Sequence, residues 1–120
     1  DYWLKRGTPK TVAMADKILS NIIEFDPDAE FNYNKFYIGL KFNGRSKNYS
    51  IFRPKKNFLA VEIKLPQTEE NDEIINQAEI TTLDYSKKYG NYRLRINERE
   101  LSEKMETIKK LIFSAKENFG

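Results

Sequence analysis

The stretch FYIGLKFNGRSKNYSIFRPKKNFLAVEIKL, residues 36–65, decides the fold of this chain. Apolar residues recur along much of it at every second position, a period that predicts β-strands with one buried face. The pattern is cleanest at its end, where Leu59, Val61, Ile63 and Leu65 share one side of a predicted strand. Residues 36–65 therefore predict antiparallel strands that are joined by short turns.

Two turn signals divide this stretch into three alternating runs, and a further alternating run precedes it. Asn43 and Gly44 both tolerate positive φ angles and therefore favour a tight turn. The segment 54–57, which begins with a proline, predicts the next turn. Four strands are expected, at residues 31–33, 36–42, 49–53 and 58–65.

A helix is predicted before the strands. Thr8 is a good N-cap and Pro9 suits the first helical position. The helix should end near Phe25, because Pro27 cannot continue it. Its expected apolar face consists of Val12, Ala15, Leu19 and Ile22.

Three further elements are predicted after the strands. A short helix over residues 69–78 would be capped by Thr68, with acidic residues in its favourable first turn. Residues 83–96 predict a hairpin that turns at 87–91, with Arg93 facing outward. Asn97 and Glu100 have the spacing of a capping box and begin the last helix. The buried stripe of that helix is expected to be Leu101, Met105, Ile108, Leu111, Ile112 and Ala115.

These elements predict an α+β fold. Its sheet should be mainly antiparallel, a four-strand meander plus a hairpin, and two long helices should cover one face. The other face would then be at least partly open and is a candidate working surface. We expect residues 8–120 to form a single domain, and residues 1–7 to be a tether or linker from a preceding region. The chain begins with Asp1 and not Met, so we expect a domain from the C-terminal end of a longer protein.

The composition excludes several chemistries. The 120 residues include neither histidine nor cysteine, so the chain alone can form no Ser-His-Asp triad, Cys-His pair or conventional zinc site. The five glycines are too dispersed for a phosphate-binding loop. No apolar run approaches the ~18 residues of a membrane span. We therefore expect no catalysis, no cofactor and no membrane contact, in a protein of the reducing cytoplasm.

Positive charge is concentrated in the predicted strands. Residues 35–64 contain eight Lys or Arg and one acid, Glu62, while the whole chain carries a net charge of only +3. Tyr37, Phe52 and Phe58 lie among these cations. Such a surface can contact the phosphates of DNA or RNA and stack on their bases. The candidate nucleic-acid-binding residues are Lys41, Arg53, Lys55, Lys56, Lys64, Lys87, Lys88, Tyr89, Arg93 and Arg95.

Two other interpretations of this surface stay open. It could be a solvated face that keeps the sheet soluble and protects its edges, and the acidic segment 69–84 could fold across it. Alternatively, the exposed aromatic residues could dock onto other domains of the parent protein.

One motif suggests a nuclease. Glu62-Ile63-Lys64, with Asp28 upstream, looks like the PD-(D/E)xK pattern, in which two carboxylates hold magnesium. A chain this rich in Glu and Lys contains about one such triplet by chance. Two whole predicted strands also separate Asp28 from Glu62, so a nuclease is the remote alternative.

Four stretches resemble a known family: FDPD at the end of the first predicted helix, YNKFYIGLKFNG, FRPKKNFLAVEIKLP and KKYGNYRLRI. They are similar to a small α+β domain of unknown function at the C-terminal end of bacterial proteins. Some of those proteins are labelled predicted transport proteins, and the domain often follows a restriction-nuclease-like or other enzymatic domain. The resemblance covers most of the chain after Gly7. It implies an accessory module, and no catalytic residues are established for that family.

Overall fold

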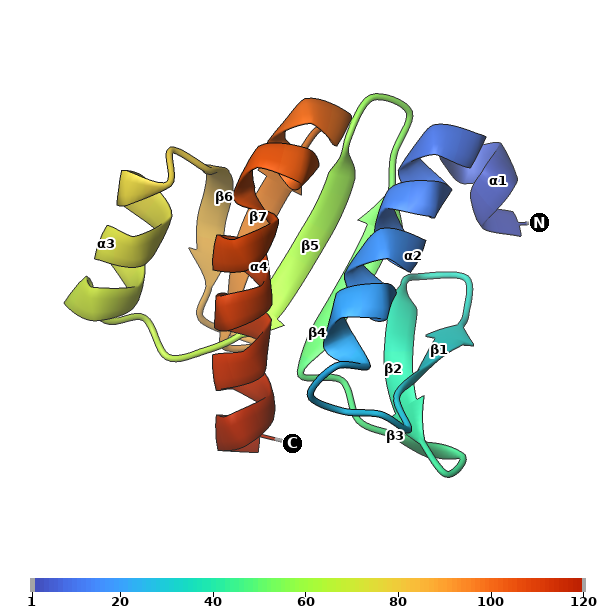
Figure 1. Cartoon of the computed structure of the whole chain (residues 1–120), viewed down its shortest axis with the longest axis horizontal. Coiled ribbons are helices and arrows are strands. Elements are labelled where there is room, and N and C mark those ends of the chain that lie inside the picture. Colours follow the sequence, from blue (N-terminus) through green and yellow to red (C-terminus); the bar gives the residue numbers. More distant parts are fainter. Residues whose placement is uncertain (1, 120) are drawn as a thin grey trace.

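The computed structural model describes residues 2–119, which form four helices and seven strands (Figure 1). In chain order the elements are α1 (Tyr2–Arg6), α2 (Pro9–Ile22), β1 (Glu30–Tyr33), β2 (Ile38–Phe42), β3 (Arg45–Ser46), β4 (Ser50–Pro54), β5 (Leu59–Lys64), α3 (Glu69–Gln77), β6 (Thr81–Ser86), β7 (Asn91–Ile96) and α4 (Glu98–Phe119). No helix among the described residues is long and apolar enough to cross a membrane.

All strand pairs of the single sheet are antiparallel, in the order β1-β2-β4-β5-β7-β6, and β3 pairs with β2. The prediction of an α+β fold with a mainly antiparallel sheet is confirmed. After β5 the chain passes through α3 and returns as β6 at the edge of the sheet. Strand β7 then pairs with both β5 and β6.

The tight turn between β2 and β3 has the predicted conformation. Asn43 and Gly44 have φ angles of 49° and 80°, which suit a two-residue hairpin turn. Strand β3, which follows this turn, was not predicted. It contains only Arg45 and Ser46, both exposed, so it gives no alternating apolar signal.

The core contains a row of four cross-strand neighbours. Ile38 pairs with Phe52, Phe52 with Val61, and Val61 with Leu94, and all four side chains are buried. Phe52 is 0% exposed, so its expected place among the surface cations was wrong. Full burial of each such side chain stabilises the fold by about 1.5–3 kcal/mol.

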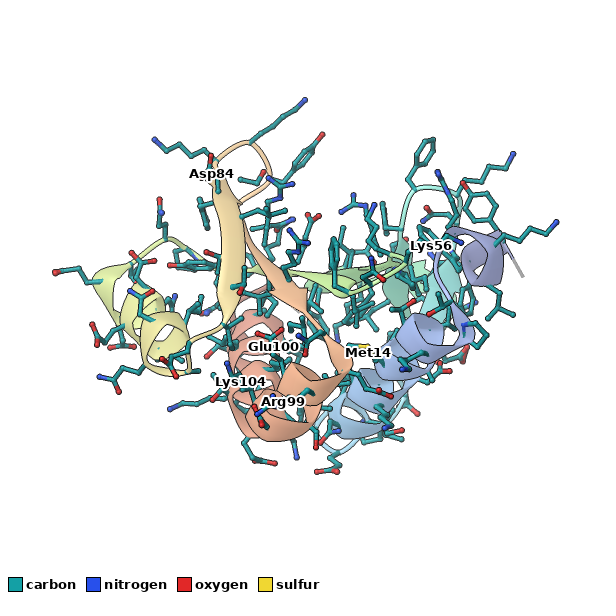
Figure 2. The ribbon with its side chains drawn as sticks, turned by 90° about the horizontal axis from the view of Figure 1, so that it is seen from above. Met14, Lys56, Asp84, Arg99, Glu100 and Lys104 are labelled. Atoms are coloured by element: carbon teal, nitrogen blue, oxygen red, sulfur yellow. The ribbon has the colours of Figure 1, made fainter. Side chains whose placement is uncertain are left out.

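Helices α2 and α4 pack against each other and against β5, and α2 also contacts β4. In the view of Figure 2 both helices lie below the sheet, with Met14 between α2 and the strands. The predicted α2 face was partly wrong. Ala15 and Ile22 are buried, but Met14 and Ile18 complete the buried stripe, and Val12 and Leu19 are only partly buried. Apolar residues occupy two adjacent sides of α2, so helical spacing alone did not identify the buried side.

The predicted helix caps are present. The Thr8 side chain accepts a hydrogen bond from the Thr11 amide, at 3.1 Å. Asn97 Oδ1 accepts from the Glu100 amide, and Glu100 Oε1 accepts from the Asn97 amide, which forms the expected capping box. The α4 stripe is buried as predicted, except for Met105, which is partly buried.

Part of the segment expected to be a tether forms the short helix α1. Trp3 is buried, and its Nε1 donates a hydrogen bond to the Asn34 carbonyl oxygen at 2.8 Å. The Lys56 ammonium donates to the carbonyl oxygens of Lys5 and Gly7, at 2.6 and 3.0 Å. These bonds attach α1 to the β1–β2 turn and to the β4–β5 turn.

A buried tyrosine–carboxylate pair joins the end of α2 to the start of β4. The Tyr49 hydroxyl donates a hydrogen bond to Asp26 Oδ2 at 2.8 Å, and both residues are buried. The Lys47 ammonium lies 4.0 Å from the same oxygen. Burial, followed by this hydrogen bond, raises the pKa of the Tyr49 phenol, so the hydroxyl stays a donor.

Two further tyrosines hold α3 beside the sheet. The Tyr92 hydroxyl donates to Asp72 Oδ1 at 2.7 Å, and the Tyr85 hydroxyl donates to the Leu65 carbonyl oxygen at 2.6 Å. The two rings meet edge to face, with 4.9 Å between their centroids. Burial, followed by the bond to Asp72, raises the pKa of Tyr92 to about 12.

Replacing Tyr49 with phenylalanine should lower the free energy of unfolding by about 2 kcal/mol, because the buried Asp26 carboxylate loses its donor. Tyr89→Phe is the matched control and should change stability by less than about 0.5 kcal/mol, since Tyr89 is exposed. Urea denaturation measures both values. Equal stability of the two variants would contradict this role of the Tyr49–Asp26 bond.

Alkaline pH should destabilise the protein partly through Tyr92. The pKa of Tyr92 is raised in the folded state, so its contribution is complete below pH ~10 and is lost as the pH rises toward 12. The free energy of unfolding of Tyr92→Phe should therefore fall less steeply over this range than that of the unsubstituted protein. The other titrating groups are common to both proteins. If the free energy of unfolding fell equally steeply with pH in both, Tyr92 would not contribute to the alkaline destabilisation.

Candidate functional site

The face of the sheet that is turned away from the core carries most of its charged side chains. Along β4, β5 and β7 every second residue is buried, and the alternate residues are directed to this other face. The strand register arranges them in rows. Arg53 lies opposite Ala60, which lies opposite Arg95, and in the next row Glu62 lies opposite Arg93.

Residues of this face line an open groove of about 950 Å³. Its floor comes from β4, β5, β7 and β6, and its sides include residues of the β1–β2 turn and of the β6–β7 hairpin. In Figure 2 the hairpin, near the labelled Asp84, and the β1–β2 segment rise on the side away from α2 and α4.

The groove brings together half of the predicted binding residues. Its lining includes Arg53, Lys55, Lys64, Tyr89 and Arg93. It does not include the other five candidates, which are Lys41, Lys56, Lys87, Lys88 and Arg95.

These other candidates have different surroundings. The Lys56 ammonium is bonded to the backbone beside α1, as described above. The Arg95 guanidinium lies over the Phe58 ring, 4.2 Å from its centroid, and Phe58 is part of the groove wall. Lys87 and Lys88 are exposed at the hairpin turn, and Lys41 is half-buried on β2.

Arg53 has structural contacts as well as a place in the groove. It forms an ion pair with Glu62, and its Nε donates to the Phe36 carbonyl oxygen at 2.9 Å. Its guanidinium also lies 5.8 Å from the centroid of the Tyr37 ring. Charge reversal at Arg53 would therefore disturb the groove itself. Charge reversal at Lys56 would remove the hydrogen bonds that attach α1 to the β4–β5 turn.

The Glu62 carboxylate is held within the groove by two partners. It pairs with Arg53, and it accepts a hydrogen bond from Asn91 Nδ2 at 3.2 Å. Lys64 lines the same groove, but Asp28 is not among the lining residues. The structure thus brings together only the Glu62 and Lys64 parts of the nuclease-like pattern. Among residues 2–119 no group of three or more acidic side chains could hold a metal ion.

The acidic segment 69–84 does not close the groove. Of its acidic residues, only Asp84 lines the groove. Figure 1 shows α3 beside β6, at the edge of the sheet. The groove itself contains four cations and two acids, Glu62 and Asp84. Since Arg53 and Glu62 pair with each other, Lys55, Lys64 and Arg93 face a single remaining carboxylate.

Aromatic side chains stand at both sides of the groove. Phe36 was expected to share the buried side of its strand, but its side chain is 78% exposed, because β2 begins only at Ile38. Tyr89, on the opposite side, is 61% exposed. Tyr37, Phe58 and Tyr85 also line the groove and are half-buried, and the first two lie against the guanidinium groups described above.

An asparagine that sequence reasoning missed completes the wall near β2. Asn48 Oδ1 accepts a hydrogen bond from the Leu40 amide at 2.8 Å, and this places the side chain over Gly39. A Cβ atom at Gly39 would lie 2.4 Å from that oxygen, so a larger residue there would displace Asn48 from the Leu40 amide. A glycine inside a strand is the sequence signal for such a close approach.

Comparison with known proteins adds no relative. No family model, no curated protein and no solved structure matches this chain. The family resemblance of its four sequence stretches therefore stays a prediction, and the groove is interpreted from its own residues.

Proposed function

We propose that this chain is a non-catalytic recognition module of a larger bacterial protein, and that it binds nucleic acid through the groove. The observation that carries the proposal is that Lys55, Lys64 and Arg93 line one groove and have no ion-pair partner among residues 2–119. Lys and Arg side chains that are free of internal partners can neutralise phosphates and release their counterions.

The arrangement of the sheet supports this proposal. We infer that α2 and α4 together cover one face, on which the core lies, and leave the groove face for a ligand. Phosphate contacts orient a nucleic acid without reading its sequence. The half-buried position of Lys64 and Arg93 on adjacent strands suits such contacts, because the strands hold the two side chains in a fixed relation.

A docking surface for another domain of the parent protein is the second candidate. The observation that favours it is the exposed apolar surface of Phe36 and Leu83, which both line the groove. Docking through apolar contacts would depend weakly on salt, whereas phosphate binding weakens steeply as salt rises. The remote nuclease alternative would require magnesium-dependent cleavage that Glu62→Ala abolishes.

The triple variant Lys55→Gln, Lys64→Gln, Arg93→Gln should bind DNA and RNA at least tenfold more weakly at low salt. The slope of log affinity against log salt should become shallower by about 2, because up to three phosphate contacts are lost. Fluorescence anisotropy with labelled oligonucleotides measures both quantities.

The matched control is Lys17→Gln, Arg99→Gln, Lys110→Gln, which removes the same charges from α2 and α4 outside the groove. It should bind as the unsubstituted chain does. An equal loss of affinity in both triple variants would show that only net charge matters. Absence of any binding to single- or double-stranded nucleic acid at low salt would refute the proposed function.

A further inference from the structure

We propose that the ligand of the groove is a single-stranded nucleic acid, whose bases stack on Phe36 and Tyr89 at the two sides. This inference rests on the proposed function and identifies the form of nucleic acid that the groove accepts. It follows from the placement of the aromatic rings, whereas the proposed function follows from the placement of the charges.

The first observation is that each of these exposed rings stands on a turn with a fixed backbone. Asn34 Oδ1 accepts hydrogen bonds from the amides of Phe36 and Tyr37, at 2.8 and 2.9 Å. The Phe36 carbonyl oxygen is held by Arg53, and the Asn34 carbonyl oxygen by Trp3. The Phe36 ring is therefore exposed while the backbone beneath it is restrained.

The Tyr89 turn is restrained in a similar way. The amides of Tyr89 and Gly90 donate to Ser86 Oγ and to the Ser86 carbonyl oxygen, at 3.2 and 2.7 Å. Gly90 has a φ angle of 70°, which glycine adopts without strain, and its carbonyl oxygen accepts from the Leu65 amide. A base that stacks on either ring would meet a platform that loses little backbone freedom on binding.

The second observation is that the other three aromatic rings of the groove already have a guanidinium or aromatic partner. Arg53 lies beside Tyr37, Arg95 lies over Phe58, and Tyr85 meets the Tyr92 ring edge to face. The Lys88 ammonium lies 5.3 Å from the centroid of the Tyr89 ring, but Tyr89 is still 61% exposed. Phe36 and Tyr89 are the two groove rings with most of their surface exposed, and they lie on opposite sides of the floor. The floor spans four strands, or about 14 Å at ~4.8 Å per strand spacing.

The third observation is the position of the charges. Lys64 and Arg93 are half-buried on the floor strands β5 and β7, whereas Phe36 and Tyr89 are exposed on the turns at the two sides. A single strand can place phosphates on the floor and turn its bases toward the rings. In a duplex the base faces are covered by stacking on their neighbours, so Phe36 and Tyr89 would have no partner.

The inference is tested on the full chain with three labelled probes of equal length: a dT oligonucleotide, an rU oligonucleotide and a DNA duplex. At low salt the unsubstituted chain should bind at least one single strand more tightly than the duplex. Tighter binding of dT or of rU supports the inference in either case and identifies the preferred sugar.

Phe36→Leu and Tyr89→Leu should each weaken single-strand binding by roughly tenfold, because a stacking platform is removed. Their salt slopes should stay unchanged, since no cation is lost. Tyr89→Phe keeps the ring and should keep the affinity. Tyr33→Leu is the control, because Tyr33 is 60% exposed but lies on β1 outside the groove.

The results separate this inference from the proposed function. If the duplex binds as tightly as the single strands, or if the two leucine variants bind dT and rU as the unsubstituted chain does, stacking is refuted while phosphate binding can stand. If none of the three probes binds, both proposals are refuted. Thermal unfolding of each variant shows whether it is folded.

Discussion

The structure depends on the packing of one row of side chains across four antiparallel strands. Ile38, Phe52, Val61 and Leu94 are neighbours on β2, β4, β5 and β7, and all of them are buried. Because side chains alternate in a strand, a slip of one residue in any of these pairs would exchange the two faces of a strand. It would move charged side chains such as Arg53 or Glu62 into the core, where an unpaired charge is very costly. The apolar row therefore holds the strands in a single register.

The same register creates the groove. Each buried residue of β4, β5 and β7 has neighbours in its own strand that are directed to the other face, so core packing positions the cations as well. Arg53 connects the floor of the groove to one of its sides. It pairs with Glu62 across β4 and β5, and it donates a hydrogen bond to the Phe36 carbonyl oxygen in the β1–β2 turn. The fold itself therefore holds the Arg53 side chain in one position.

Much of the fold was predictable, because its signals are local. Period-two alternation predicted β4, β5 and β7, the Asn43-Gly44 pair predicted its turn, and the Asn97 capping box predicted the start of α4. The site was predictable only in part. Three features depend on partners that are distant in the sequence. They are the face that Phe52 occupies, the residue at which β2 begins after Phe36, and the contacts of the Lys56 ammonium. The sequence could therefore nominate nine basic residues and Tyr89, but only the tertiary structure separated those of the groove from the others.

Amide chemical-shift mapping can show whether a nucleic acid occupies the groove. The isotope-labelled chain would be titrated with a short dT oligonucleotide and with its rU counterpart at low salt. We expect chemical-shift changes that are confined to β4, β5, β7 and the turns around Phe36 and Tyr89, with α2 and α4 unaffected on their exposed sides. Shifts that concentrate on the helices, or that are absent from the groove strands at saturating oligonucleotide, would contradict it.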